Sequence, residues 1–323
     1  GYVNQGWSSK KNSEKATAKA KCTVNKNITL YAVQKKAVQL TFHRCDGSTW
    51  QKTTLAKGSS YSLPGVRDAE GYTFMGWSTK PMQSVSPQYE AEEKITVNGN
   101  VDLYAVVFNR TTETDLTEDQ LPQVDIYKYK QVIFVGDSRT EFMENVLTGM
   151  GESATKNVKF VCSAGKGLDW FTTTGWAQLY SIVQHDSNSI LSKKTAVIFN
   201  FGVNDLSKSA DYAEYYNWIA PQLKSKGCEL YFMSVNPVNR LMLPNAGRAD
   251  RSEAAVRSFN QYMKANLPSA YTYIDMYSYL KSTGYSFASD HYGTGTVDDG
   301  LHYTTRTYKR IFAKCMDSLR VPA

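Results

Sequence analysis

Four short polar segments, each placed after an apolar run or shortly before a helical pattern, hold the residues most suited to chemistry. They are residues 136–139, 163–167, 201–205 and 299–302. Ser138 offers a hydroxyl nucleophile, and His302 is a suitable base because an unperturbed imidazole titrates at about pH 6.5. Asp299 lies three residues before His302, close enough to accept the imidazole N–H, and this spacing favours it over the neighbouring Asp298. A nucleophile, a base and a carboxylate that orients the base are the requirements of acyl transfer to a serine.

Acyl transfer also needs hydrogen-bond donors for the oxyanion that forms at the carbonyl. Asn204 offers a side-chain amide, and the N–H of Ser138 itself would add a second donor. The glycines in segment 163–167 offer a backbone N–H that a ligand can approach closely. Counting from the end of the preceding apolar run favours Gly167 for this role, and Gly165 stays an alternative.

The elements that must position these segments change in character at about residue 127. Short apolar runs, typical of buried strands, alternate there with helical patterns, as in residues 212–223. The expected strands are 132–135, 158–162, 196–200, 230–235 and 271–274. Such alternation predicts a parallel sheet covered by helices on both faces. Ligands of these sheets bind at the carboxyl ends of the strands, so the four polar segments should converge at one edge.

Three of these blocks resemble the motifs of the SGNH, or GDSL-like, hydrolase family. They are Gly-Asp-Ser at 136–138, Gly-x-Asn-Asp at 202–205 and Asp-x-x-His at 299–302, and the resemblance covers about residues 131–319. It implies a flavodoxin-like three-layer α/β domain with esterase, deacetylase, lipase or acyl-transfer activity. It assigns the serine to Ser138, the asparagine to Asn204, the acid–base pair to Asp299 and His302, and the glycine to Gly167, with Gly165 still open.

Two details separate this sequence from related patterns. Arg139 stands where GDSL proteins in the narrow sense carry Leu, a common variation that could shape substrate choice. The Gly-x-Ser-x-Gly elbow of α/β-hydrolases is absent, because Thr140 occupies the position of its second glycine.

The first third of the chain contains an internal repeat. GYVNQGWS at residues 1–8 recurs as GYTFMGWS at 71–78, and LYAV at 30–33 recurs at 103–106. The offsets of 70 and 73 residues imply a three-residue insertion between the copies. The unit is therefore present one and a half times, which suggests that the chain was cut from a longer one or that its start is missing. Apolar and polar residues alternate in the complete unit, as in half-buried strands.

The complete unit resembles the internalin-type B repeat (Listeria–Bacteroides repeat), a small β-grasp-like module of bacterial surface proteins. The resemblance rests on GYTFMGWSTKP and on a later strand that ends in LYAVV. It implies a secreted or cell-surface location and contact with a cell wall or host surface, but it supplies no chemistry. We expect a truncated repeat at 1–37, a complete repeat at 38–110, a linker with some helix at 111–126 and the hydrolase domain at 127–323.

Composition excludes several other classes of protein. The hydrophobic fraction of 41% and the charged fraction of 21% are typical of globular proteins. The net charge of +7 is scattered apart from a Lys-rich patch at 10–26, so we do not expect a nucleic-acid partner. No apolar run reaches the roughly 18 residues of a transmembrane segment. The five cysteines form no CxxC pair, and no His, Cys or carboxylate cluster predicts a metal, so no cofactor is expected.

We therefore expect an extracellular or cell-surface serine esterase that removes an O-acetyl or other short acyl group from a glycan or a small ester. The reaction would use a Ser-His-Asp triad and an acyl-enzyme. An O-acyltransferase with the same triad is one alternative, and a surface binding protein with a vestigial hydrolase domain is another. The natural ester, and the choice between hydrolysis and transfer, stay open at this point.

Overall fold

The computed structural model describes residues 1–18, 23–124, 129–186, 194–244, 250–288 and 299–319. The chain divides into two compact units. The first consists of Gly1–Pro64, Gly76–Gln83 and Pro87–Val107, and the second of Gly65–Met75, Ser84–Ser86 and Phe108–Ala323. Each unit has its own sheet, and the four polar segments singled out above all belong to the second.

The N-terminal part is β-rich, as predicted. Its strands are β1 (Tyr2–Ser8), β2 (Tyr31–His43), β3 (Thr49–Ala56), β4 (Ser59–Ser62), β5 (Tyr72–Ser78), β6 (Lys94–Val97) and β7 (Val101–Asn109). One sheet has the order β1-β2-β7-β5 with β3 paired to β2, and β4 pairs with β6 separately. Leu40, Phe42, Trp77 and Leu103 are fully buried within it. Burial of these alternating apolar side chains stabilises the module.

The second unit contains a five-stranded sheet whose neighbouring strands are all parallel. Its strands are β8 (Tyr129–Gly136), β9 (Val158–Cys162), β10 (Lys194–Asn200), β11 (Cys228–Met233) and β12 (Tyr271–Ile274), in the order β12-β11-β10-β8-β9. These are the five strands that the apolar runs predicted. The α/β fold class is thereby confirmed.

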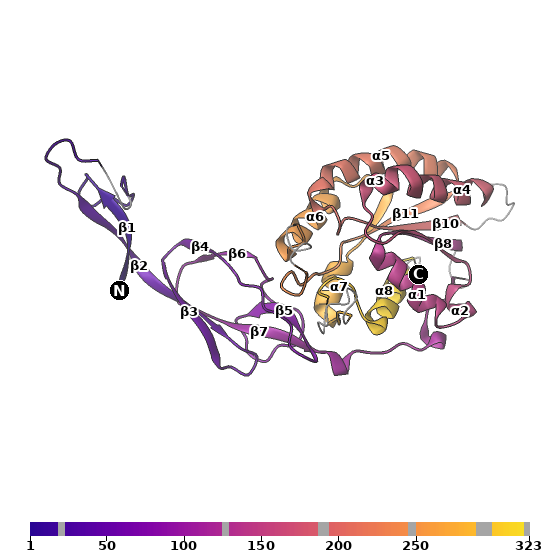
Figure 1. Ribbon diagram of the computed structural model, residues 1–323, viewed down its shortest axis with the longest axis horizontal. Helices are drawn as coiled ribbons and strands as arrows, with labels where there is room; N and C mark the ends of the chain where they lie inside the picture. Colours follow the sequence, from indigo (N-terminus) through magenta and orange to yellow (C-terminus); the bar gives the residue numbers. More distant parts are fainter. Residues whose placement is uncertain (19–22, 125–128, 187–193, 245–249, 289–298, 320–323) are drawn as a thin grey trace. The chain divides into compact units, whose positions relative to one another are not determined.

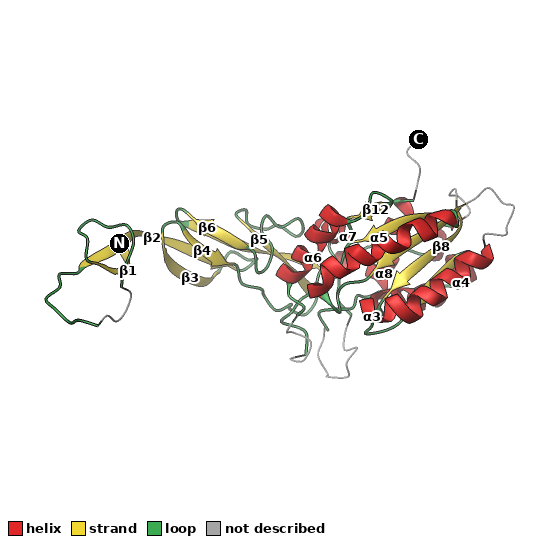
Figure 2. Ribbon diagram, turned by 90° about the horizontal axis from the view of Figure 1, so that it is seen from above, coloured by secondary structure: helices red, strands yellow, loops and turns green. Residues whose placement is uncertain are grey.

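Helices cover both faces of this sheet (Figures 1 and 2). They are α1 (Ser138–Thr148), α2 (Glu152–Thr155), α3 (Leu168–Trp170), the π-helix η4 (Phe171–Gly175), α4 (Trp176–Asp186), η5 (Leu206–Lys208), α5 (Ser209–Ser225), α6 (Glu253–Asn266), α7 (Met276–Thr283) and α8 (Thr305–Asp317). Ile133 and Val135 of β8 join one core with α4, α5 and α6. Phe134, between them in sequence, instead packs against Phe312 of α8, because successive side chains of a strand point to opposite faces.

The strand register places the polar segments at the same edge. Gly136, the last residue of β8, pairs with Asn200 at the end of β10 and with Cys162 at the end of β9. A Cβ atom at Gly136 would lie 2.7 Å from the carbonyl oxygen of Asn200 and still closer to the side chain of Thr140, so only glycine fits at this position. The segments after these three strands therefore start side by side.

The stretch predicted as a linker packs within the second unit. Leu121 and Val124 are buried, and short 3₁₀ helices form at η1 (Arg110–Thr112) and η2 (Glu118–Gln120). We therefore propose that the second domain begins near Phe108 rather than at residue 127. Within the described residues, no helix has the length and apolar character needed to cross a membrane.

Candidate active site

Ser138, His302 and Asp299 form a continuous chain of hydrogen bonds. His302 Nε2 lies 2.8 Å from Ser138 Oγ, and His302 Nδ1 lies 2.7 Å from Asp299 Oδ2. A carboxylate only accepts hydrogen bonds, so Nδ1 carries the proton and Nε2 presents its lone pair to the serine hydroxyl. All three side chains are buried. The structure thus brings together the three residues that the motifs pointed to, although 164 positions separate Ser138 from His302.

Asp137 determines where α1 begins and hence where Ser138 lies. Its side chain caps the helix by accepting a hydrogen bond from the N–H of Arg139 at 3.0 Å. Ser138 is therefore the first residue of α1, where the helix dipole favours developing negative charge. Burial raises the pKa of the Asp137 carboxyl to about 6, against the lowering effects of the Arg139 charge and of the hydrogen bond from its N–H.

The Asp299 carboxylate is held by its own turn. Oδ1 accepts from the backbone N–H groups of Leu301 at 2.8 Å and His302 at 2.7 Å, which leaves Oδ2 for the imidazole. Gly300 adopts a φ of +68° within this turn, and a Cβ there would lie 2.4 Å from the carbonyl oxygen of Asn239. The competing Asp298 lies outside the described residues.

Asn204 and Asp205 tie the third segment to the second. Asn204 Nδ2 donates to the carbonyl oxygen of Lys166 at 2.8 Å, and Asp205 Oδ2 accepts from the N–H of Leu168 at 2.8 Å. A Cβ on Gly167 would lie 2.3 Å from Asp205 Oδ2, so this close approach requires glycine. Gly165 requires glycine for a different reason, its φ of +70°. Both glycines are thus explained structurally, and the choice of oxyanion donor between them stays open.

Arg139 is held inside the protein by backbone carbonyl groups. The side chain is 2% exposed, and its guanidinium donates to the carbonyl oxygens of Leu301, Asn236 and Pro237 at 2.9–3.0 Å. It also lies over the ring of Tyr303. Arg139 therefore fixes two backbone segments near Ser138, and its part in substrate choice stays a prediction.

Two contacts of the site were missed by the sequence analysis. Arg251 Nη2 donates to Asn204 Oδ1 at 2.6 Å, although no motif surrounds this arginine. The ring of Phe142 packs edge-on against the imidazole of His302, with 4.6 Å between the ring centroids. Phe142 lies one helical turn after Ser138, so the i,i+4 spacing was the only signal that could have identified it.

Comparison with known families decides the class of this domain. The model of the GDSL-like lipase/acylhydrolase family matches residues 132–315, which is more than half of the chain. The chain belongs to the GDSL-like lipase/acylhydrolase family. Members of this family are carboxylic ester hydrolases. The model of the Listeria-Bacteroides repeat domain matches residues 1–33 and 39–106, which precede the acylhydrolase domain.

Solved structures similar to this acylhydrolase are distant in sequence. A proposed acylhydrolase from Bacteroides fragilis is 16% identical, with coverage of 63% of this chain and 94% of that one and a TM-score of 0.40. The acetyl xylan esterase AlAXEase is 12% identical, with coverage of 59% and 100% and a TM-score of 0.40. The C-terminal catalytic domain of peptidoglycan O-acetyltransferase A from Streptococcus pneumoniae is 16% identical, with coverage of 59% and 92% and a TM-score of 0.34. No curated protein matches the chain.

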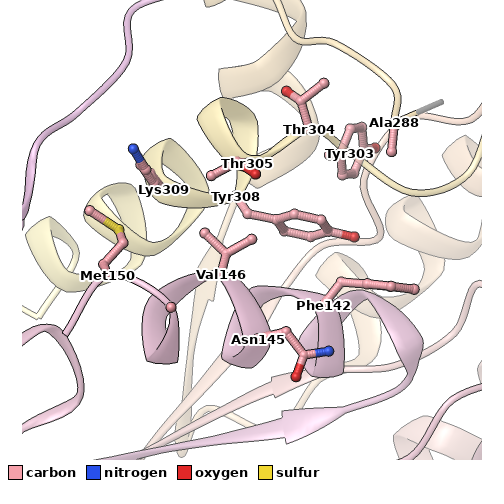
Figure 3. A pocket seen from close by; sticks show the side chains of 11 residues that line it. Phe142, Asn145, Val146, Met150, Ala288, Tyr303, Thr304, Thr305, Tyr308 and Lys309 are labelled. Atoms are coloured by element: carbon pink, nitrogen blue, oxygen red, sulfur yellow. The ribbon is translucent and has the colours of Figure 1, made fainter. Parts of the chain in front are cut away.

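A groove of about 620 Å³ lies in the acylhydrolase domain between α1 and the start of α8. Figure 3 shows Phe142 and Val146 of α1 on one side and Thr305 and Tyr308 of α8 on the other. The side chain of Phe142 lines this groove and also packs against the imidazole of His302. One side chain thus contacts both the candidate base and the groove.

The described residues of the acylhydrolase offer no metal centre. Among the residues that the structure describes, no group of three or more His, Cys, Asp or Glu side chains is arranged to hold an ion.

Proposed function

We propose that this acylhydrolase is a serine esterase that removes an O-acetyl or other short acyl group from a glycan. The observation that carries the proposal is the hydrogen-bonded chain from Ser138 Oγ through His302 to Asp299. A serine hydroxyl is a weak nucleophile at its own pKa, and a neutral imidazole within hydrogen-bond reach activates it. Family membership supports ester hydrolysis as the reaction class.

In the proposed reaction, Ser138 Oγ attacks the ester carbonyl while His302 Nε2 takes the hydroxyl proton. Asp299 stabilises the imidazolium that results. The N–H of Ser138, the N–H of Gly167 and Asn204 Nδ2 bind the oxyanion of the tetrahedral intermediate. His302 then returns the proton to the leaving alcohol and the acyl-enzyme forms. Water, with His302 again as base, releases the acid and restores the serine hydroxyl.

The groove beside Phe142 supports an ester with a large alcohol part. The group that protonates the leaving alcohol must lie next to it, so the alcohol occupies the His302 side of the reacting carbon. Phe142, which packs against the His302 imidazole, also lines the groove between α1 and α8, whose volume lies within the range of about 300–1,000 Å³ usual for ligand pockets. Aromatic side chains together with Asn145 and Thr305 suit a sugar ring, which has both apolar faces and hydroxyls.

The repeats support a location at the cell surface or outside the cell. Listeria-Bacteroides repeats are typical of surface proteins, and here they precede the catalytic unit. In this role the repeats would hold the enzyme near a cell wall or a host surface. A pull-down of the isolated cell-wall fraction by the whole chain tests this part of the proposal, with the chain from Phe108 onward as the matched control.

The reaction itself is tested by measuring acetate release from acetylated xylan and acetylated peptidoglycan, and the turnover of p-nitrophenyl acetate. Ser138→Ala should lower turnover of every active ester by at least about a thousandfold, because loss of a triad member commonly costs several orders of magnitude. The exposed Ser278→Ala is the matched control and should retain full activity. Turnover by Ser138→Ala within about tenfold of the unsubstituted protein would rule out the mechanism. Formation of an acetylated sugar acceptor in place of free acetate would show acyl transfer instead of hydrolysis.

A further inference from the structure

Arg251 helps to fix which way the Asn204 amide points. A guanidinium group can only donate hydrogen bonds, and Arg251 Nη2 lies 2.6 Å from the Asn204 side chain. The atom that it meets must be the amide oxygen Oδ1, so Nδ2 faces the opposite direction. Arg251 Nε donates in addition to the carbonyl oxygen of Val203 at 3.1 Å. The two contacts clamp the backbone and the side chain of the same short segment.

The remaining hydrogen-bonding capacity of Asn204 can be counted. The amide nitrogen carries two N–H groups, and one of them donates to the carbonyl oxygen of Lys166 at 2.8 Å. Lys166 lies between Gly165 and Gly167, the two glycines that compete for the backbone donor. With Oδ1 held by Arg251 and one N–H held by Lys166, a single N–H of Nδ2 is left for a ligand.

We propose that Arg251 is a positioning residue for the oxyanion hole of this enzyme. Its guanidinium holds the amide of Asn204 in the orientation that presents Nδ2 to the oxyanion. The positive charge of the guanidinium beside Oδ1 also polarises the amide, which strengthens the remaining N–H as a donor. This inference rests on the proposed function, because it takes Asn204 as one of the oxyanion donors.

The cost of losing Arg251 follows from the shape of the asparagine side chain. Without the guanidinium, only the hydrogen bond to the Lys166 carbonyl oxygen holds the amide, and in rotamers that turn it over Oδ1 would face the developing oxyanion and repel it. Removal of one oxyanion donor costs roughly 10²–10³ in kcat in a well-studied protease. Misorientation of the donor should cost part of that, about tenfold to a hundredfold, and should act on kcat rather than on KM because the oxyanion forms only during the reaction.

The test is a double-mutant cycle in the whole chain with p-nitrophenyl acetate as substrate. Arg251→Met should lower kcat by about tenfold to a hundredfold and change KM by less than about threefold. In an Asn204→Ala background the same substitution should change kcat by less than about twofold, because the group that it positions is already gone. Arg251→Lys should restore part of the loss, since an ammonium also donates to Oδ1 but cannot clamp Val203 as well.

Lys264→Met is the matched control for loss of a positive charge. Lys264 lies near the end of α6, which begins two residues after Arg251, and its side chain is 63% exposed. This control should keep the kcat of the unsubstituted protein. Thermal unfolding of all variants shows whether each one folds, and if Arg251→Met does not fold, the cycle is carried out with Arg251→Lys.

Three outcomes would overturn the inference. They are an unchanged kcat in the Arg251 variant, an equal loss in the presence and absence of the Asn204 side chain, and full activity of Asn204→Ala itself. Each of these can occur while Ser138→Ala is inactive, so they are separate from a failure of the proposed function, which an active Ser138→Ala would reveal.

Discussion

The Glu113 carboxylate, which precedes the parallel sheet in sequence, accepts a hydrogen bond from Arg310 Nη1 of α8 at 3.0 Å. Ser286 and Thr307 donate to the same carboxylate, and both glutamate and arginine are buried. The backbone of Ser286 accepts in turn from the N–H of Thr304, two residues after His302. A residue predicted to lie in a linker thus supports the segment that carries His302.

Loss of this carboxylate should destabilise the catalytic unit. Glu113→Ala leaves the Arg310 guanidinium buried with one partner fewer, and removing one member of a buried ion pair costs about 3–5 kcal/mol of unfolding free energy. Chemical denaturation measures this change, with the exposed Glu214→Ala on α5 as a control that should stay within about 0.5 kcal/mol.

For the same reason, a chain that starts at residue 127 should be less stable than one that starts at Phe108. Equal stability of the two shortened chains would contradict this view of the domain boundary.

Asp299→Asn should abolish most activity while it preserves the turn. Oδ1 of the asparagine can still accept from the N–H groups of Leu301 and His302, but Nδ2 would then face His302 Nδ1 as a donor. The imidazole would have to take the other tautomer, with Nε2 protonated and unable to accept the serine proton. In a well-studied serine protease the same change lowers kcat by about 10⁴. Steady-state kinetics on p-nitrophenyl acetate measures the loss, and a loss below about tenfold would show that the carboxylate is not needed.

Asp137 should make the stability of the protein depend on pH in the acidic range. Its pKa is raised from 3.8 to about 6, so between about pH 4 and pH 6 the folded state holds more protons than the unfolded chain. The free energy of unfolding therefore falls as the pH rises through this window. A shift of about two pH units corresponds to about 3 kcal/mol.

Asp137→Asn removes this titration and keeps a good helix cap, since Asn is about as effective as Asp at this position. As the pH rises from 4 to 7, the free energy of unfolding of the variant, relative to that of the parent, should therefore increase by up to about 3 kcal/mol. Urea denaturation at the two pH values measures it. A difference that is the same at both pH values would show that Asp137 does not titrate in this window.

A bulky side chain in the α1–α8 groove should discriminate between esters by the size of their alcohol. Val146→Trp fills the groove one turn beyond Phe142, away from the serine and the imidazole. We expect kcat/KM for p-nitrophenyl acetate to change by less than about twofold, and kcat/KM for an acetylated oligosaccharide to fall at least about tenfold. Val146→Ala, which widens the groove, is the matched control. An equal fall for both esters would indicate distortion of the catalytic residues, and no fall for either would place the alcohol elsewhere.

Much of the fold could be predicted because its signals are local. Each strand of the parallel sheet is a short apolar run, and the residues after those runs meet at one edge because parallel strands align their carboxyl ends. Ser138 and Asn204 could be singled out as candidates because each belongs to a short motif directly after a strand, and Asp299 and His302 because their motif lies shortly before a helix.

The supporting contacts could not be predicted, because they join positions far apart in the chain. Arg251 is 47 residues from Asn204, and Glu113 is 197 residues from Arg310. Nothing near either residue distinguishes it from an ordinary surface charge, whose side chain would remain in water. Arg139 is a further case, because nothing in its place beside the serine indicated that its guanidinium would be buried among backbone carbonyl groups. The sequence by itself thus determined which residues are the candidates for the site. Which charged side chains are buried, and which partners pair with them, was decided by the tertiary structure, because a charge removed from water must be paired inside the protein.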